Sequence, residues 1–234
     1  MNQEKGEEKV SDRILKAVPE FHSSIADQCE LLLELGLLVE RYTSLSGSEM
    51  IDLSLLDKLE ERKEQFRNRN MDKLHQSFHT NPFERDDLYW IFFSINKLIA
   101  DIKNMLRMMQ ALGIGTDHHM AVMARMVREA CFSLRRGYRK VASNPIEGLQ
   151  DAQVIRSLRD MIEDTYNVAI SELYDGDEIR KSMSILPHAD ANMKAVAQVM
   201  EMFKRREVYR YFFDLARELG EAATVLQSVV YTIA

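Results

Sequence analysis

The stretch FHTNPFERDDLYW, residues 78–90, separates two long segments of helical sequence pattern. Pro82 suits the first position of a helix, because its missing N–H would be unpaired there in any case. Asn81 then becomes the N-cap, and Glu84 falls at the third helical position, as in a capping box. Glu84 and the two aspartates that follow Arg85 also place negative charge at the positive end of the helix dipole. The stretch therefore predicts a structural corner at a helix start rather than an active site.

On both sides of this corner the chain is typical of long helices. Glycine (9) and proline (4) are scarce, and apolar residues recur at the helical period. The short segments SLSGS, GIGTD, SNPIEG and DGDE interrupt this pattern. We predict helices at about 12–43, 53–79, 82–112, 117–141, 145–174 and 190–233, the last with a break near Lys204.

These helices predict an all-α fold, an antiparallel bundle of six or seven long helices. Short connections favour two three-helix bundles side by side, at about 12–113 and 117–234, within a single domain covering 12–234. Residues 1–11 are polar and charged, and we expect them to form a flexible tail.

Composition limits the classes of function. Of the 234 residues, 46% are hydrophobic and 29% charged, which is ordinary for a soluble globular protein. The net charge of -6 argues against a nucleic-acid partner. No apolar run approaches the roughly 20 residues of a membrane span, and the N-terminus lacks the apolar core of a secretion signal. We expect the two cysteines to be buried free thiols, which fits a cytoplasmic location.

Catalytic patterns are missing from the sequence. It contains no Glu-x-x-His pair of a di-metal bundle, no glycine-rich phosphate loop and no nucleophile elbow. We therefore expect that the protein is not an enzyme. The 14 methionines are expected mainly in the core, although a Met-rich, partly apolar face is also compatible with a homodimer.

Pairs of acidic residues four positions apart recur inside the long helices. Glu60 and Glu64 form one pair, and Asp214 and Glu218 form another. Residues at this spacing face the same way, so two such helices could cage a cation with oxygen ligands. The alternative is a solvated helix face, and the spacing alone leaves both interpretations open.

The corner itself resembles a known family. The sequence LHQSFHTNPFERDDLY is similar to a box in the PhoU-related phosphate-transport regulators, the group often encoded beside Pit-type phosphate permeases. Asn81 is an extra residue relative to that box. The resemblance extends at lower identity to FHSSIADQCELLLELGLLV and REVYRYFFDLARELGEAA. The residues that match the box are Phe78, Thr80, Pro82, Phe83, Glu84, Arg85, Asp86, Asp87 and Leu88.

The resemblance implies two three-helix bundles and metal clusters held by Glu/Asp-x-x-x-Asp motifs on paired helices. The first motif falls on Glu60 and Glu64, and both positions are acidic. The second falls on about Asn96 and Ala100, and neither is acidic. Lys97 stands where another acid is common in the family. The implied site is therefore eroded in the first half of the chain.

The second half retains more of these motifs. The third falls on Arg159 and Glu163 and keeps one acid, and the fourth falls on Asp214 and Glu218 and keeps both. The resemblance implies iron or another divalent or trivalent ion, with candidate ligands Glu60, Glu64, Glu163, Asp214 and Glu218.

Basic residues at the positions that have lost an acid suggest that positively charged side chains take the place of a metal ion. Buried carboxylates need a cation or a proton. We hypothesise that Arg159 and Lys97 pair with Glu163 and Glu64, or with acids across the bundle, in place of a metal.

The function that the resemblance implies is a non-enzymatic regulator or accessory protein of inorganic phosphate transport. Its expected partner is a phosphate permease or a phosphate-sensing protein, contacted through helix surfaces, with the protein at most peripheral to the membrane. Two alternatives remain open at this point. One is a metal-binding bundle that uses the carboxylates of the second half, and the other is a divergent scaffold protein.

Overall fold

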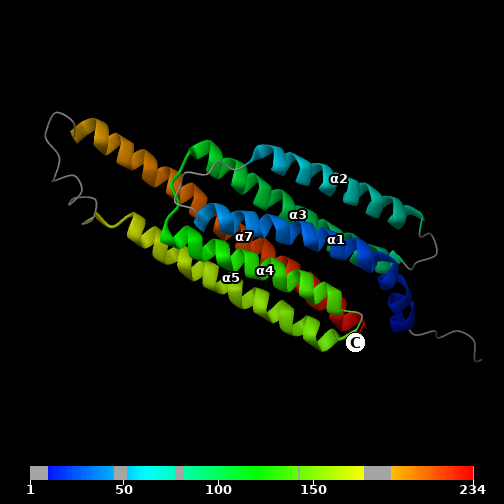
Figure 1. Cartoon of the computed structure of the whole chain (residues 1–234). Helices are drawn as coiled ribbons and strands as arrows, with labels where there is room; N and C mark the ends of the chain where they lie inside the picture. Colours follow the sequence, from blue (N-terminus) through cyan, green and yellow to red (C-terminus); the bar gives the residue numbers. More distant parts are fainter. Residues whose placement is uncertain (1–9, 45–51, 77–81, 142, 177–190, 234) are drawn as a thin grey trace, which may run out of the picture.

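The computed structural model describes residues 10–44, 52–76, 82–141, 143–176 and 191–233 (Figure 1). These residues form long helices and no strand, which confirms the predicted all-α class. The predicted boundaries that fall on described residues hold to within two residues, while the predicted end of the second helix at residue 79 lies outside them. The helices, labelled as in Figure 1, are α1 Val10–Ser44, α2 Leu53–Gln76, α3 Pro82–Leu112, α4 His118–Lys140, α5 Pro145–Leu173 and α7 Ala191–Ile233.

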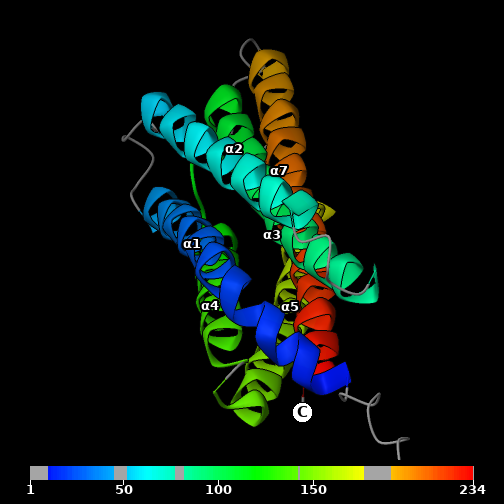
Figure 2. The same cartoon turned by 90° about the vertical axis from the view of Figure 1, so that its right-hand side faces the viewer.

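The helices pack as two groups of three. Each of α1, α2 and α3 contacts the other two, and the same holds for α4, α5 and α7. The groups join mainly where α1 packs on α4 and where α3 packs on α7. The four helices at this junction, α1, α3, α4 and α7, are the central helices, with α2 on one side of them and α5 on the other (Figures 1 and 2). None of the helices in the described residues has the length and apolar character needed to cross a membrane.

Two helices begin with the same short pattern, Asn-Pro-x-Glu. Helix α3 begins at Pro82, as predicted, while Asn81 lies outside the described residues. Helix α5 begins at Pro145, and Asn144 is its N-cap. The Asn144 side chain accepts a hydrogen bond from the backbone N–H of Glu147 at 3.4 Å and donates one to the Glu147 carboxylate at 2.7 Å. The α5 start therefore shows the capping that the sequence predicts for α3.

The predicted break near Lys204 is wrong, because α7 continues through it as one helix of 43 residues. Arg205 ion-pairs with Asp117, the N-cap of α4, at 2.7 Å and with Glu201 one turn away at 3.4 Å. Tyr209 donates a hydrogen bond to the same Asp117 carboxylate at 2.7 Å. These contacts hold the cationic segment of α7 against the start of α4 and keep it helical.

The core lies between the central helices and is made of aliphatic side chains and methionines. Phe212 of α7 is fully buried and belongs to the same core cluster as the buried leucines and isoleucines of α1 and α3. The expectation that methionines lie in the core is confirmed for four residues of α3 and α4 that are no more than 1% exposed, namely Met105, Met109, Met120 and Met123.

Helices α1 and α4 approach closely at Gly36. A Cβ atom there would lie 3.3 Å from the Cα of Arg128 and 3.4 Å from the Sγ of Cys131, so a larger residue would push the helices apart. Cys29 and Cys131 are both buried and free, as predicted. Burial raises the pKa of the Cys131 thiol to about 12, so it remains protonated at neutral pH.

Candidate functional site

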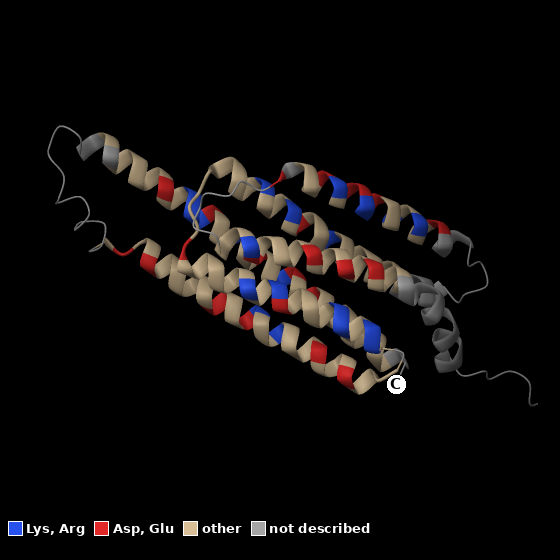
Figure 3. Ribbon diagram, in the orientation of Figure 1, with Lys and Arg blue, Asp and Glu red and all other residues tan. Residues whose placement is uncertain are grey.

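Glu60 and Glu64, the first predicted pair of metal ligands, lie on α2 and are engaged by cations. Glu60 accepts hydrogen bonds from Lys63 at 2.8 Å and from Lys103 of α3. Burial alone would raise the pKa of Glu60, but the two lysines outweigh it and the pKa is lowered. Glu64 pairs with Lys63 at 3.6 Å and with Arg67 at 2.5 Å. Both signs of charge are interspersed along α2 (Figure 3), so these acids serve as ion-pair partners.

Helix α3 carries the second pair of positions, Asn96 and Ala100, and neither supplies a charge. Asn96 accepts a hydrogen bond from the side-chain amide of Gln28 on α1 at 3.5 Å. The adjacent Lys97 instead forms an ion pair with Glu218 of α7. The prediction that Lys97 pairs with Glu64 is therefore wrong, while its stated alternative, an acid across the bundle, is confirmed.

Carboxylates from α3 and α7 surround Lys97. Its hydrogen bond to Glu218 is the main reason why the pKa of Lys97 is raised, and Glu221 and Asp101 add to this effect through space. The pKa of Asp101 is also raised, first by burial and then by the negative charges of Glu218 and Asp214. One lysine thus faces several acids, and negative charge remains in excess at this α3–α7 seam.

Asp101, which belongs to this charge network, and Lys103, which pairs with Glu60 of α2, were missed in the sequence. The signal for Asp101 was its position four residues after Lys97, since residues at this spacing share a helix face. The signal for Lys103 was a cation within an apolar helical stripe, where burial requires an acidic partner. Lys103 is only 8% exposed and finds that partner in Glu60.

On α5, Arg159 and Glu163 do not form the predicted pair. Arg159 binds the neighbouring Asp160, with its Nε at 2.9 Å and one Nη at 2.6 Å from the same carboxylate oxygen. The aliphatic part of Arg159 lies over α7, where a Cβ on Gly220 would come within 2.8 Å of its Cδ. The pairing of Arg159 with Glu163 is therefore wrong, because the arginine stem packs against the glycine of α7 and its head group turns to Asp160.

The predicted ligands do not fit the metal cluster that the resemblance implies. They are spread over α2, α5 and α7, and lysines already bind Glu60 and Glu218. In the part of the chain that the structure describes, no three His, Cys, Asp or Glu side chains are grouped so that they could hold a metal ion. Asp214 is 55% exposed and lies 4.0 Å from Arg210. The metal assignment remains a prediction without geometry to support it.

An exposed aromatic cluster lies on α3, one to two turns before Lys97. Tyr89, Trp90 and Phe93 are 44%, 54% and 46% exposed. Their rings contact one another, with centroids 6.0 Å apart for Tyr89–Trp90, 6.1 Å for Tyr89–Phe93 and 5.6 Å for Trp90–Phe93. Exposed single apolar residues are common, but three adjoining aromatic rings form a surface suited to binding another protein.

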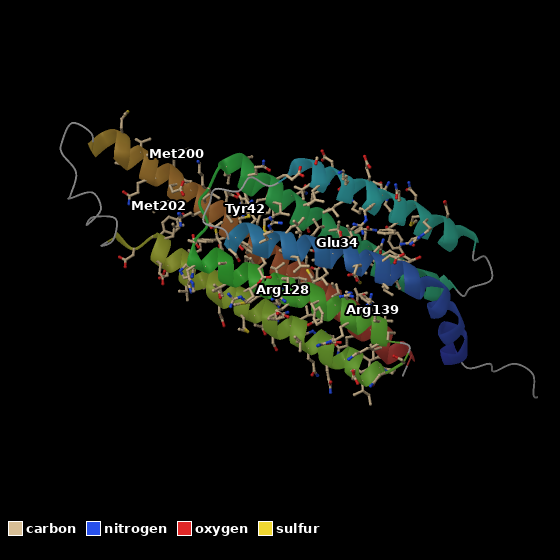
Figure 4. All side chains as sticks on the ribbon, in the orientation of Figure 1. Glu34, Tyr42, Arg128, Arg139, Met200 and Met202 are labelled. Carbon is tan, nitrogen blue, oxygen red and sulfur yellow. The ribbon has the colours of Figure 1, made fainter. Side chains whose placement is uncertain are left out.

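A second charged region lies on α4, where arginines face α1 (Figure 4). Arg128 binds Glu40 at 2.8 Å, and Arg139 lies 3.4 Å from Glu30. A cavity of about 260 Å³ opens nearby, lined by Phe132, Arg135, Arg136, Arg139 and Lys140. The cations of this cavity pair with acids of α1 and α5, so they tie helices together at the negative end of the α4 dipole.

The α3–α7 seam therefore combines an aromatic cluster with an under-compensated acidic cluster, and it is the strongest candidate for a functional surface. Comparison with protein-family models and with curated proteins finds no match to the chain.

Proposed function

We propose that the protein is a non-enzymatic regulator or accessory protein of inorganic phosphate transport. It acts through helix-surface contacts with a phosphate permease or a phosphate-sensing protein. The link to phosphate rests on the sequence resemblance of the corner at residues 78–90 and of the two longer segments described above. The arrangement of six long helices as two groups of three agrees with what that resemblance implies.

The observation that carries a contact-based role is the aromatic cluster of Tyr89, Trp90 and Phe93. Tyr89 and Trp90 end the corner and Phe93 follows it, and all three rings are exposed on α3 rather than buried in the core. Large aromatic side chains are the residues that most often anchor a protein partner. A regulator that works by contact needs such a surface and needs no catalytic group.

The lysines support a regulator that does without the implied metal. Lys97 and Lys103 supply positive charge to Glu218 and Glu60, which satisfies these acids without a metal ion. Elemental analysis of the purified protein should therefore find no stoichiometric iron or other transition metal. A full complement of metal per chain would contradict this substitution.

The proposed place of action is the cytoplasmic face of the membrane that holds the permease, with the protein bound at its periphery. The test is deletion of the gene followed by measurement of radiolabelled phosphate uptake and of a phosphate-responsive reporter. Loss of the protein should change uptake or the phosphate concentration at which the reporter responds. Unchanged uptake together with an unchanged reporter would overturn the proposal.

A further inference from the structure

One continuous surface joins the aromatic cluster to the acidic cluster, and we call it the aromatic–acidic strip. On α3 the residues Tyr89, Phe93, Lys97 and Asp101 follow one another at intervals of four, with Trp90 beside the first two. Side chains at this spacing lie on one helix face, so the rings and the charges share a surface. The residues of the strip are Tyr89, Trp90, Phe93, Lys97 and Asp101 of α3 with Asp214, Glu218 and Glu221 of α7.

The strip has the dimensions of a short helix. From Trp90 to Asp101 the rise along α3 is roughly 16 Å, which matches about three turns of a second helix lying against it. The pair of Lys97 and Glu218 fixes α7 beside α3 at the acidic end. The packed helices α3 and α7 therefore hold the aromatic end of the strip at a fixed distance from its acidic end.

The charge of the strip selects its partner. Asp101, Asp214, Glu218 and Glu221 are four carboxylates, and Glu207 adds a fifth at the end of the strip. The cations beside them are Lys97, Arg210, which is 4.0 Å from Asp214 and also pairs with Glu207, and the exposed Arg217, one turn from Asp214 and from Glu221. Acids therefore outnumber basic residues. Burial is the main reason why the pKa of Asp101 is raised, and the negative charges of Glu218 and Asp214 add to this effect while Lys97 opposes it. A cation brought by a partner would be attracted here, whereas an anionic lipid surface would be repelled. A second copy of the strip would bring the same excess of negative charge and is disfavoured for the same reason.

We propose that the aromatic–acidic strip docks a basic amphipathic helix of a partner protein. The helix places apolar side chains on the rings of Tyr89, Trp90 and Phe93, and its lysines or arginines meet Asp101, Asp214 and Glu221. This inference rests on the proposed function, because it names the chemistry of the segment that the partner presents. The aromatic rings supply the anchor and the charges set the orientation of the bound helix.

Trp90 makes the strip directly measurable, since the chain has a single tryptophan. The probe is a synthetic helical peptide of about 14 residues, four turns, with leucines on one face of its first half and lysines in its second half. Titration into the full-length protein should shift the emission of Trp90. The affinity should fall when the salt concentration rises about tenfold, from about 50 to about 500 mM, because salt screens the attraction between the charges. A peptide with glutamates in place of the lysines should bind at least about tenfold more weakly.

Matched variants separate the strip from general surface effects. Asp214→Lys with Glu221→Lys should weaken peptide binding by about tenfold or more, because both acids are exposed and near the proposed cations. The control, Asp160→Lys with Asp164→Lys on α5, adds the same charge at exposed positions away from the strip and should leave binding unchanged. Phe93→Ser should weaken binding, while Phe203→Ser, at an equally exposed ring of α7, should not. Equal effects of strip and control variants, no change of Trp90 emission, or preferred binding of the glutamate peptide or of anionic vesicles would overturn the inference.

The failure of this inference and the failure of the proposed function are distinguishable. If deletion alters phosphate uptake and the Asp214→Lys, Glu221→Lys variant restores it fully, the strip is not the docking surface although the proposed function stands. If deletion leaves uptake and signalling unchanged while the lysine peptide binds as described, the phosphate role fails and the strip remains a docking surface for a basic helix.

Discussion

Lys97 of α3 forms an ion pair with Glu218 of α7, at the seam where the two three-helix groups meet. Only 17% of the Glu218 side chain is exposed, whereas Lys97 is 40% exposed and reaches in from the edge of the seam. A lysine thus neutralises a shielded carboxylate at a position where the family resemblance implies an acidic metal ligand.

The first prediction concerns this pair. Lys97→Met should lower the free energy of unfolding at neutral pH by about 0.5–1 kcal/mol, because Glu218 loses its direct partner and the lysine is partly exposed. Urea denaturation of the variant and of the wild type measures the difference. Lys58→Met, at an exposed position on α2, provides a control that should change little. A variant as stable as the wild type would show that the pair contributes nothing.

The second prediction concerns Asp101. Because folding raises the pKa of this carboxyl, its ionisation opposes folding. The protonated carboxyl of Asp101 contributes stability that is fully present below the ordinary aspartate pKa, near pH 4. This contribution is lost as the pH rises through the raised pKa of Asp101. Asp101→Asn should therefore be more stable than the wild type at pH 7, and the gain should vanish near pH 3. Thermal unfolding across this range measures it, and a gain that persists at pH 3 would point to a cause other than charge.

The third prediction concerns Glu60, where the sign is opposite. Hydrogen bonds from Lys103 and Lys63 outweigh the effect of burial and lower the pKa of Glu60, so its contribution to stability is present above the ordinary glutamate pKa and lost on acidification. Lys103→Met should cost about 1–2 kcal/mol at pH 7, because a hydrogen bond to a charged group is removed. The deficit should shrink as the pH falls through the lowered pKa of Glu60, because the protonated carboxyl no longer attracts Lys103. A deficit independent of pH would assign it to packing instead.

The fourth prediction concerns the Asn-Pro-x-Glu helix starts. Asn144→Ala should destabilise the protein by about 1 kcal/mol, because the N-cap hydrogen bond to the backbone of Glu147 is lost. Asn81→Ala should cost a similar amount if the same pattern caps α3. Asn144→Ser and Asn81→Ser serve as conservative controls and should retain most of the stability, since serine also caps helices and adds no charge beside the glutamate. A much smaller loss at Asn81 would show that the corner is stabilised by other contacts.

The sequence predicted the helices well because the evidence for them is local. The helical period and the scarcity of glycine and proline identify the long helices. The Asn-Pro pairs identify where α3 and α5 start. The error at Lys204 has the opposite origin. The contacts of this part of α7, from Arg205 and Tyr209 to Asp117, join residues about ninety positions apart in the chain, so no local pattern reveals them.

The ion-pair partners were harder to predict, because they depend on which helices meet and at what register. Spacing placed Lys97 on the right kind of surface but could not choose between Glu64 and Glu218 as its partner. Arg159 turned to Asp160 because its stem packs on Gly220, a contact visible only after α5 and α7 are placed together. The role of Tyr89 and Trp90 could not be predicted, because an apolar pattern alone also fits a core position. Only the structure shows that these two rings are exposed.

Phosphate uptake in a strain that lacks the protein, complemented with matched variants, tests the central claim most directly. The wild-type chain and the Asp160→Lys, Asp164→Lys control should both restore normal uptake, while the Asp214→Lys, Glu221→Lys variant should restore it poorly although it accumulates to the same level. If the strain without the protein takes up phosphate and responds to it like the parent strain, the account of a phosphate-transport regulator is contradicted.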